Sequence, residues 1–127
     1  MLSDFSAMPV LAITDLDRAR SFYEGTLGFS AVREVADGVM YRAGGVDILV
    51  YPSSYAGTNK ATAMSFSVPE AAFDDEVADL RRRGVTFETY DMEGVTWIDG
   101  VATMDGMRSA WFTDPDGNIL NVEAATS

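Results

Sequence analysis

The chain of 127 residues contains no cysteine and no histidine. Without cysteine, the chain can form no disulfide, thiol nucleophile or thiolate metal site. Without histidine, it lacks the commonest general base and the commonest transition-metal ligand of proteins. Any chemistry that the protein performs must therefore rest on carboxylates, tyrosine, arginine or amide groups.

Positive charge is also scarce in this sequence. The chain has 9 Lys and Arg residues against 20 Asp and Glu, a formal net charge of -11, and Lys60 is its one lysine. A phosphate backbone needs a basic stripe, so we expect no nucleic-acid partner. An acidic surface attracts cationic ligands over long range, although it also serves solubility alone.

Long hydrophobic runs are missing as well. No apolar stretch approaches the roughly 18 residues of a membrane span, and residues 1–5 lack the basic and apolar regions of a secretion signal. We therefore expect no membrane partner and a cytoplasmic location. Hydrophobic residues make up 47% and charged residues 23% of the chain. This composition and length are typical of one globular domain that spans residues 1–127.

The first half of the chain shows the pattern of a strand, a helix and three strands. An apolar run at residues 7–13 predicts a strand, and Thr14 or Asp15 then offers an oxygen that caps a helix, with Asp17 three positions after Thr14. That helix is expected to end at Gly28. Its apolar stripe consists of Leu16, Ala19, Phe22, Tyr23 and Leu27. The further strands are expected at residues 29–35, 38–42 and 46–51.

The second half repeats this pattern. Residues 63–68 alternate as a strand, Pro69 suits the first turn of a helix, and Gly84 ends that helix after three arginines that complement its dipole. The next strand is predicted at residues 85–90, and a long loop or irregular hairpin at residues 91–107. The last two strands are expected at residues 109–113 and 119–124.

The shared order of elements indicates an internal repeat. Its two βαβββ modules span about residues 5–55 and 60–125. A single helix covers only one face of each predicted sheet, so neither module is expected to stand alone. The uncovered faces must therefore cover each other or cover a ligand.

The end of the chain contains a predicted β-hairpin. Its turn runs from Asp114 to Asn118, because proline presets φ while glycine and asparagine tolerate positive φ. In the returning strand, alternation places Leu120 and Val122 on one face and Ile119, Asn121 and Glu123 on the other. The first face is interpreted as core, and the second as a surface that meets water or a ligand. By the same alternation we expect Phe112 in the core and Trp111 in the cavity.

Two motifs resemble those of the vicinal oxygen chelate superfamily, the group of glyoxalase I, bleomycin-resistance proteins, fosfomycin-resistance proteins and extradiol dioxygenases. Residues 11–29 contain a strand, a "D-L-x-x-A-x-x-F-Y" helix and an "L-G-F" exit, and residues 111–118 look like the final hairpin of that group. The resemblance covers nearly the whole chain. It implies an α+β fold in which two βαβββ modules form curled mixed sheets around a concave pocket, usually in a homodimer.

In the metalloenzymes of this superfamily, four inward-facing side chains, commonly His, Gln and Glu, bind a divalent ion. The resemblance places these positions at Met8, Leu49, Ala63 and Asn121. Hard and borderline divalent ions prefer carboxylates, imidazole or several oxygens, which this set does not offer. We therefore expect no metal and no other cofactor.

Alternation along the strands predicts a mostly apolar pocket, as is typical of small-molecule sites. The predicted ligand-binding residues are Met8, Leu49, Tyr51, Ala63, Trp97, Trp111, Asn121 and Glu123. Residues 91–107 are interpreted as a mobile wall whose methionines adapt to a ligand. In the alternative interpretation, Trp97 and Ile98 are buried at a module or dimer contact, and the Asn121 amide only satisfies a neighbouring strand or a buried water.

Three functions fit these observations. The favoured one is a metal-free small-molecule binding protein resembling the bleomycin-resistance branch, a homodimer that sequesters a cationic or aromatic ligand. The alternative is a glyoxalase-like lyase or isomerase, or a dioxygenase-related enzyme. In a metal-independent form of it, Glu123 acts as a general base and Tyr51 or Arg108 stabilises an oxyanion. The third is an interaction module whose pocket is filled by its own side chains.

Overall fold

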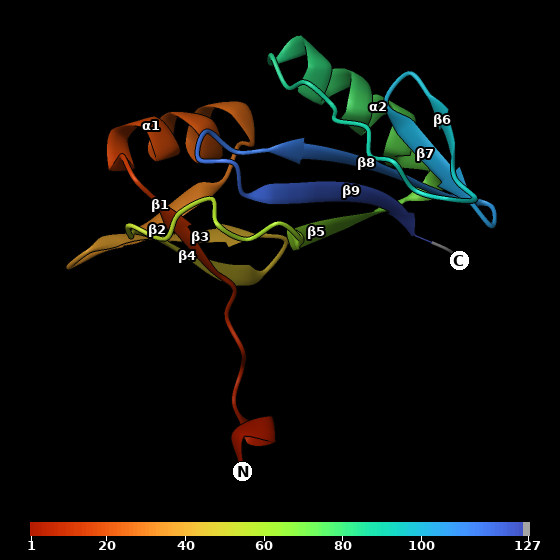
Figure 1. Cartoon of the computed structure of the whole chain (residues 1–127). Coiled ribbons are helices and arrows are strands. Elements are labelled where there is room, and N and C mark those ends of the chain that lie inside the picture. The colour runs from red at the N-terminus through yellow and green to blue at the C-terminus, as the bar shows by residue number, and fades with distance from the viewer. Residues whose placement is uncertain (126–127) are drawn as a thin grey trace.

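The structure is a computed structural model that describes residues 1–125. Its first half forms a four-stranded mixed sheet in the order β1-β4-β3-β2, with β1 parallel to β4 (Figure 1). The strands are β1 (Val10–Ile13), β2 (Ser30–Val35), β3 (Gly38–Ala43) and β4 (Val46–Pro52). One face carries α1 (Leu16–Arg20), which continues as the π-helical turn η2 (Ser21–Thr26). The chain before β1 starts with a short 3-10 helix, η1 (Leu2–Asp4), and extends away from the sheets.

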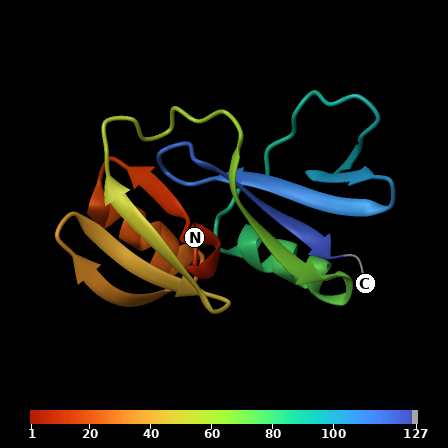
Figure 2. The ribbon, with the colours of Figure 1, turned by 90° about the horizontal axis from the view of Figure 1, so that it is seen from below.

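The second half forms a five-stranded mixed sheet in the order β5-β9-β8-β7-β6, with β5 parallel to β9. The strands are β5 (Thr62–Pro69), β6 (Thr96–Ile98), β7 (Val101–Met104), β8 (Met107–Thr113) and β9 (Ile119–Ala125). The helix α2 (Glu70–Arg82) packs on one face. Figure 2 shows the two sheets side by side, with neither closed into a barrel. The predicted α+β fold of two βαβββ modules is confirmed.

The core lies between each sheet and its helix, where the apolar stripe of the helix meets one face of the alternating strands. The largest fully buried side chains are Tyr23, Tyr41, Phe73, Phe112, Ile13, Ile48, Leu120, Val39 and Val50. Gly28 and Gly84 follow the two helices with φ of 76° and 91°, the left-handed conformation that glycine adopts without steric cost. Among the described residues, no helix is long and apolar enough to cross a membrane.

The start of the first helix is capped by the second of the two residues that the sequence offers, Thr14 and Asp15. Asp15 is the capping residue, and its carboxylate accepts a hydrogen bond from the backbone N–H of Arg18 at 3.0 Å. The Thr14 hydroxyl instead donates to Asp116 in the second module. Asp15 therefore caps the helix, and Thr14 is left to connect the two modules.

The strand predicted at residues 85–90 is wrong. In that stretch only Glu88 pairs, through an isolated bridge to Trp111 in which the N–H of Glu88 donates to the Trp111 carbonyl at 2.8 Å. The neighbouring segment 91–107 forms the β6–β7 hairpin, and β7 takes the place beside β8. β7 occupies residues 107–109 of this edge of β8, and beyond them only Glu88 pairs with it, at Trp111.

The turn between β8 and β9 connects the second module to the first through buried polar groups. Asp114 is buried and accepts a hydrogen bond from the Tyr23 hydroxyl at 2.7 Å. Asn118 is buried as well, and its amide donates to the carbonyl of Ala12 in β1 at 2.7 Å. Burial and the nearby Asp114 carboxylate hold the pKa of Tyr23 far above its usual value, so the phenol stays protonated and donates.

We expect Tyr23→Phe to lower the free energy of unfolding by about 1–3 kcal/mol, because Asp114 loses a donor and stays buried. Urea denaturation followed by circular dichroism measures this change. Tyr55→Phe is the matched control, since Tyr55 is 77% exposed, and its effect should stay within about 0.5 kcal/mol. Equal stabilities of the two variants would contradict the role assigned to Tyr23.

Candidate functional site

The face of the second sheet opposite α2 is assembled by strand register. In β9, Leu120 and Val122 are buried in the core, and alternation turns Asn121 and Glu123 to the other face. One row of partners on this face crosses all five strands and consists of Trp97, Ala102, Ser109, Glu123 and Ser67. A second row consists of Trp111, Asn121 and Ser65.

A cavity of about 270 Å³ lies on this face, and we call it the sheet groove. Three of its walls are the thioether side chains of Met92, Met104 and Met107. Met104 and Met107 are direct partners at the turn of the β7–β8 hairpin, so their side chains stand together on one face. Because Met92 comes from the loop after α2, the groove has a wall outside the sheet. Its own side chains leave it open, which disfavours a self-filled interaction module.

Trp111 forms the aromatic side of the sheet groove. Its ring contacts Tyr90 edge-on at 6.1 Å between centroids and Trp97 at 5.9 Å. The indole N–H donates to the Thr62 hydroxyl at 3.0 Å, which fixes the orientation of the ring. Three aromatic side chains therefore meet beside the groove, and Trp97 is tied to the site through Trp111.

Asn121 lies at the base of the sheet groove and is 5% exposed. Its Oδ1 accepts a hydrogen bond from the hydroxyl of Ser65 on the neighbouring strand β5. Within residues 1–125, its Nδ2 makes no hydrogen bond. One end of the amide therefore ties two strands together, and the other end supplies a donor to the groove.

Glu123 is the one charged side chain among the described residues that line the sheet groove. Neither of its expected oxyanion partners lies with it in one protomer. Arg108 pairs across the sheet with Thr103 and faces α2, where it forms an ion pair with Asp74 at 2.7 Å. Tyr51 belongs to β4 of the first sheet. The groove thus offers a carboxylate without an adjacent cation.

The other predicted ligand-binding residues lie elsewhere. Leu49 and Tyr51 alternate with buried residues of β4 and so face away from α1, and Met8 precedes β1 on the same sheet. Ala63 lies at a bulge in β5 and packs against the core. Of the eight predicted residues, Trp97, Trp111, Asn121 and Glu123 share one face of the second sheet. The methionines of the groove all lie in residues 91–107, the segment that the sequence indicates as an adaptable wall, and Met104 and Met107 flank an Asp-Gly turn that signals a hairpin.

Comparison with known proteins identifies the family of this chain. The family model described as the Glyoxalase/Bleomycin resistance protein/Dioxygenase superfamily matches residues 7–122. The chain belongs to this superfamily. No match was found among the curated proteins.

Several solved structures share the fold at low sequence identity. A glyoxalase/bleomycin resistance protein/dioxygenase from Alicyclobacillus acidocaldarius superposes with a TM-score of 0.72 at 17% identity, over 98% of this chain and 93% of that one. A genomically encoded fosfomycin resistance protein from Listeria monocytogenes gives 0.71 at 15% identity, over 96% and 93%. An integron cassette protein from Vibrio cholerae gives 0.65 at 24% identity, over 96% and 97%.

The residues at the metal-ligand positions of the superfamily do not fit a metal. Met8 and Leu49 lie on the first sheet, and Ala63 has no donor atom. The Oδ1 of Asn121 is already bonded to Ser65. Among residues 1–125, no group of three or more His, Cys, Asp or Glu side chains is placed to hold a metal ion. The donor set is therefore unsuited to a hard or borderline divalent ion.

We expect the purified, tag-free protein to retain well below one metal ion per chain after incubation with Mn, Fe(II), Co, Ni and Zn and desalting. Mass spectrometry of the desalted protein gives metal per chain. The same protein without added metal is the control for background. Stoichiometric retention that Asn121→Ala abolishes would contradict our assignment of this position.

Proposed function

We propose that the sheet groove is a metal-free binding site for a small aromatic or cationic molecule, and that the protein sequesters this ligand in the cytoplasm. The observation that carries the proposal is the groove itself, which combines an aromatic wall, methionines and one carboxylate on the open face of the second sheet. Concave, mostly apolar sites with few polar groups are typical of small-molecule binding. The proposal follows the analogy of the bleomycin resistance proteins in the name of the superfamily.

The charge of the groove favours a cation over an anion. Glu123 attracts positive charge, and the face of Trp111 adds a cation–π interaction of about 0.5–2 kcal/mol. The net charge of -11 acts in the same direction over longer range. Asn121 contributes a hydrogen-bond donor at the base, so a flat cation that also carries an acceptor fits the groove best.

Methionines make the walls of the groove adaptable. Met92 and Val95 approach from the loop between α2 and β6, and Met104 and Met107 from the β7–β8 hairpin. A thioether side chain is flexible and polarizable, and it packs well against aromatic rings. These features support binding of several related compounds.

A second protomer supports the site in this proposal. The face of the first sheet opposite α1 carries Val10, which is 52% exposed, and its register partner Leu49. This apolar face and the sheet groove both lack a covering layer in the single chain, and a homodimer covers both.

We expect sedimentation equilibrium to give the mass of two chains for the wild type. Leu49→Lys should yield monomers, because it places a charge in the proposed interface. Val46→Lys is the matched control, since Val46 lies on the same strand with opposite alternation and is 48% exposed. A wild type with the mass of one chain, or a Leu49→Lys variant with the mass of two, would contradict this arrangement.

An enzyme is the second candidate, and one observation favours it. The Glu123 carboxylate and the Asn121 Nδ2 both line the groove, so a base and an oxyanion donor face one cavity. A metal-independent lyase or isomerase needs no more than this pair. Turnover of a bound compound that stops in Glu123→Gln, with the fold intact, distinguishes this candidate from the binder.

Berberine, a flat aromatic cation, is a suitable first probe for the binding function. We expect calorimetry to show saturable binding, and Glu123→Gln to weaken it about fivefold through loss of one ion pair. Anilinonaphthalene sulfonate, a flat anion, should bind more weakly. Berberine recovered unchanged by chromatography supports sequestration.

The control for this experiment is Asp75→Asn, which removes one negative charge from α2 on the opposite side of the sheet. Its affinity for berberine should match that of the wild type. If Asp75→Asn weakens binding as much as Glu123→Gln, long-range charge explains the affinity and the groove does not. Absence of berberine binding would count against the proposed function.

A further inference from the structure

A second cavity, of about 290 Å³, lies beside the sheet groove toward the other end of β9. Trp111 and Met92 line both cavities, so this pair lies between them. Tyr90 and Lys60 are among the residues that line the second cavity alone. We call the two cavities together the extended groove.

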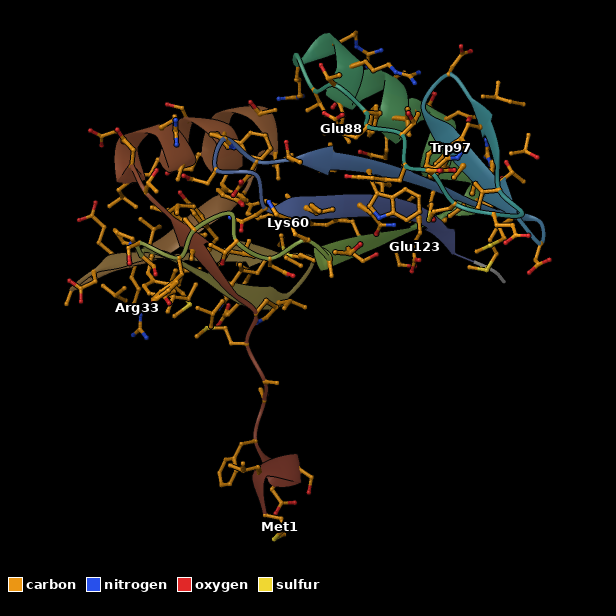
Figure 3. The ribbon with its side chains drawn as sticks, viewed as in Figure 1. Met1, Arg33, Lys60, Glu88, Trp97 and Glu123 are labelled. Atoms are coloured by element: carbon orange, nitrogen blue, oxygen red, sulfur yellow. The ribbon has the colours of Figure 1, made fainter. Side chains whose placement is uncertain are left out.

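The extended groove follows the axis of β9. Ile119 lines the second cavity, and Asn121 and Glu123 line the first. These residues share one face of β9, and from Ile119 to Glu123 the strand rises about 13 Å at its usual spacing. Lys60 precedes Thr62, the register partner of Ile119, and so lies at the end away from Glu123. Figure 3 shows Lys60 and Glu123 toward opposite ends of β9.

The two ends of the extended groove carry opposite charges. Lys60 is the one lysine of a chain with net charge -11. Within residues 1–125 it forms no ion pair, and its ammonium makes one long hydrogen bond, of 3.4 Å, to the Gly57 carbonyl. Glu123 forms no ion pair among these residues either. An ammonium and a carboxylate thus flank an apolar centre, and both are free to pair with a ligand.

We propose that the extended groove binds an elongated zwitterion, with a flat apolar body over Trp111, a cationic group at Glu123 and an anionic group at Lys60. This inference rests on the proposed function, because it extends the same site and refines the class of its ligand. A ligand with only a cationic group makes no ion pair with Lys60. A ligand with only an anionic group is repelled by the carboxylate of Glu123. The zwitterion is the one class that pairs with both ends.

Three matched probes test this inference by calorimetry. They are 4'-(aminomethyl)biphenyl-4-carboxylic acid, which is the zwitterion, 4-(aminomethyl)biphenyl, which has only the cation, and biphenyl-4-carboxylic acid, which has only the anion. We expect the zwitterion to bind about fivefold more tightly than the cation, as one exposed ion pair allows, and the anion to bind most weakly.

Two variants, each of which removes one charge, test which charged group of the probe binds at each end of the extended groove. Lys60→Gln should weaken binding of the zwitterion about fivefold and leave binding of the cation-only probe unchanged. Glu123→Gln should weaken both. The matched controls are Arg82→Gln and Asp75→Asn, which change the same charges on α2 on the opposite face of the sheet. Both controls should bind all three probes as the wild type does.

The outcomes separate this inference from the proposed function. If the zwitterion and the cation bind equally well, and Lys60→Gln changes neither affinity, the inference of a zwitterionic ligand is overturned. The proposed cation site then still stands. A loss with Lys60→Gln that Arg82→Gln reproduces would also overturn it, because it reflects overall charge. If neither the three probes nor berberine bind, the proposed function fails together with this inference.

Discussion

The buried carboxylate of Asp114 fixes the position of β9, on which the rest of the site depends. It accepts hydrogen bonds from the Tyr23 hydroxyl and the Asn118 amide, and from the backbone N–H groups of Asp116 and Asn118. These bonds close the turn, anchor it to the first module and set where β9 begins. Because strand side chains alternate with period two, a slip of one residue would exchange core and groove faces. The same turn therefore secures both packing and the binding surface.

Because strand side chains alternate, the two faces of the second sheet carry different kinds of residues. On the α2 side, apolar residues of β8 and β9 fill the core, and Arg108 is neutralised by Glu70 and Asp74 over the ring of Phe73. On the other side, aromatic rings and thioethers surround a few polar groups. Since Arg108 forms its ion pairs on the α2 side, it does not compete with a ligand for Glu123 in the sheet groove. The negative end of the groove thus depends on which face each strand residue takes.

Periodicity and turn chemistry predict most of this fold. The alternation of Trp111 with Phe112 follows from the sequence, and in the structure Phe112 is 1% exposed in the core while Trp111 lines the groove. The alternation of residues 85–90 does not give a strand, because only Glu88 pairs with β8 while β7 occupies residues 107–109 of the same edge. The bulge at Ala63 shifts its side chain to the core, because one extra residue reverses alternation.

The relation of Asn121 to Ser65 explains how this member of the superfamily differs from a metal site in the same fold. A metal ligand must present a lone pair toward the cavity. Here the Oδ1 lone pair accepts from Ser65 on β5, and the Nδ2 donor stays unbonded among the described residues. The position therefore changes from donating electrons to donating a proton in a hydrogen bond. Recognition in such a groove has to come from an acceptor on the ligand, from aromatic contact with Trp111 and from charges at the two ends of β9.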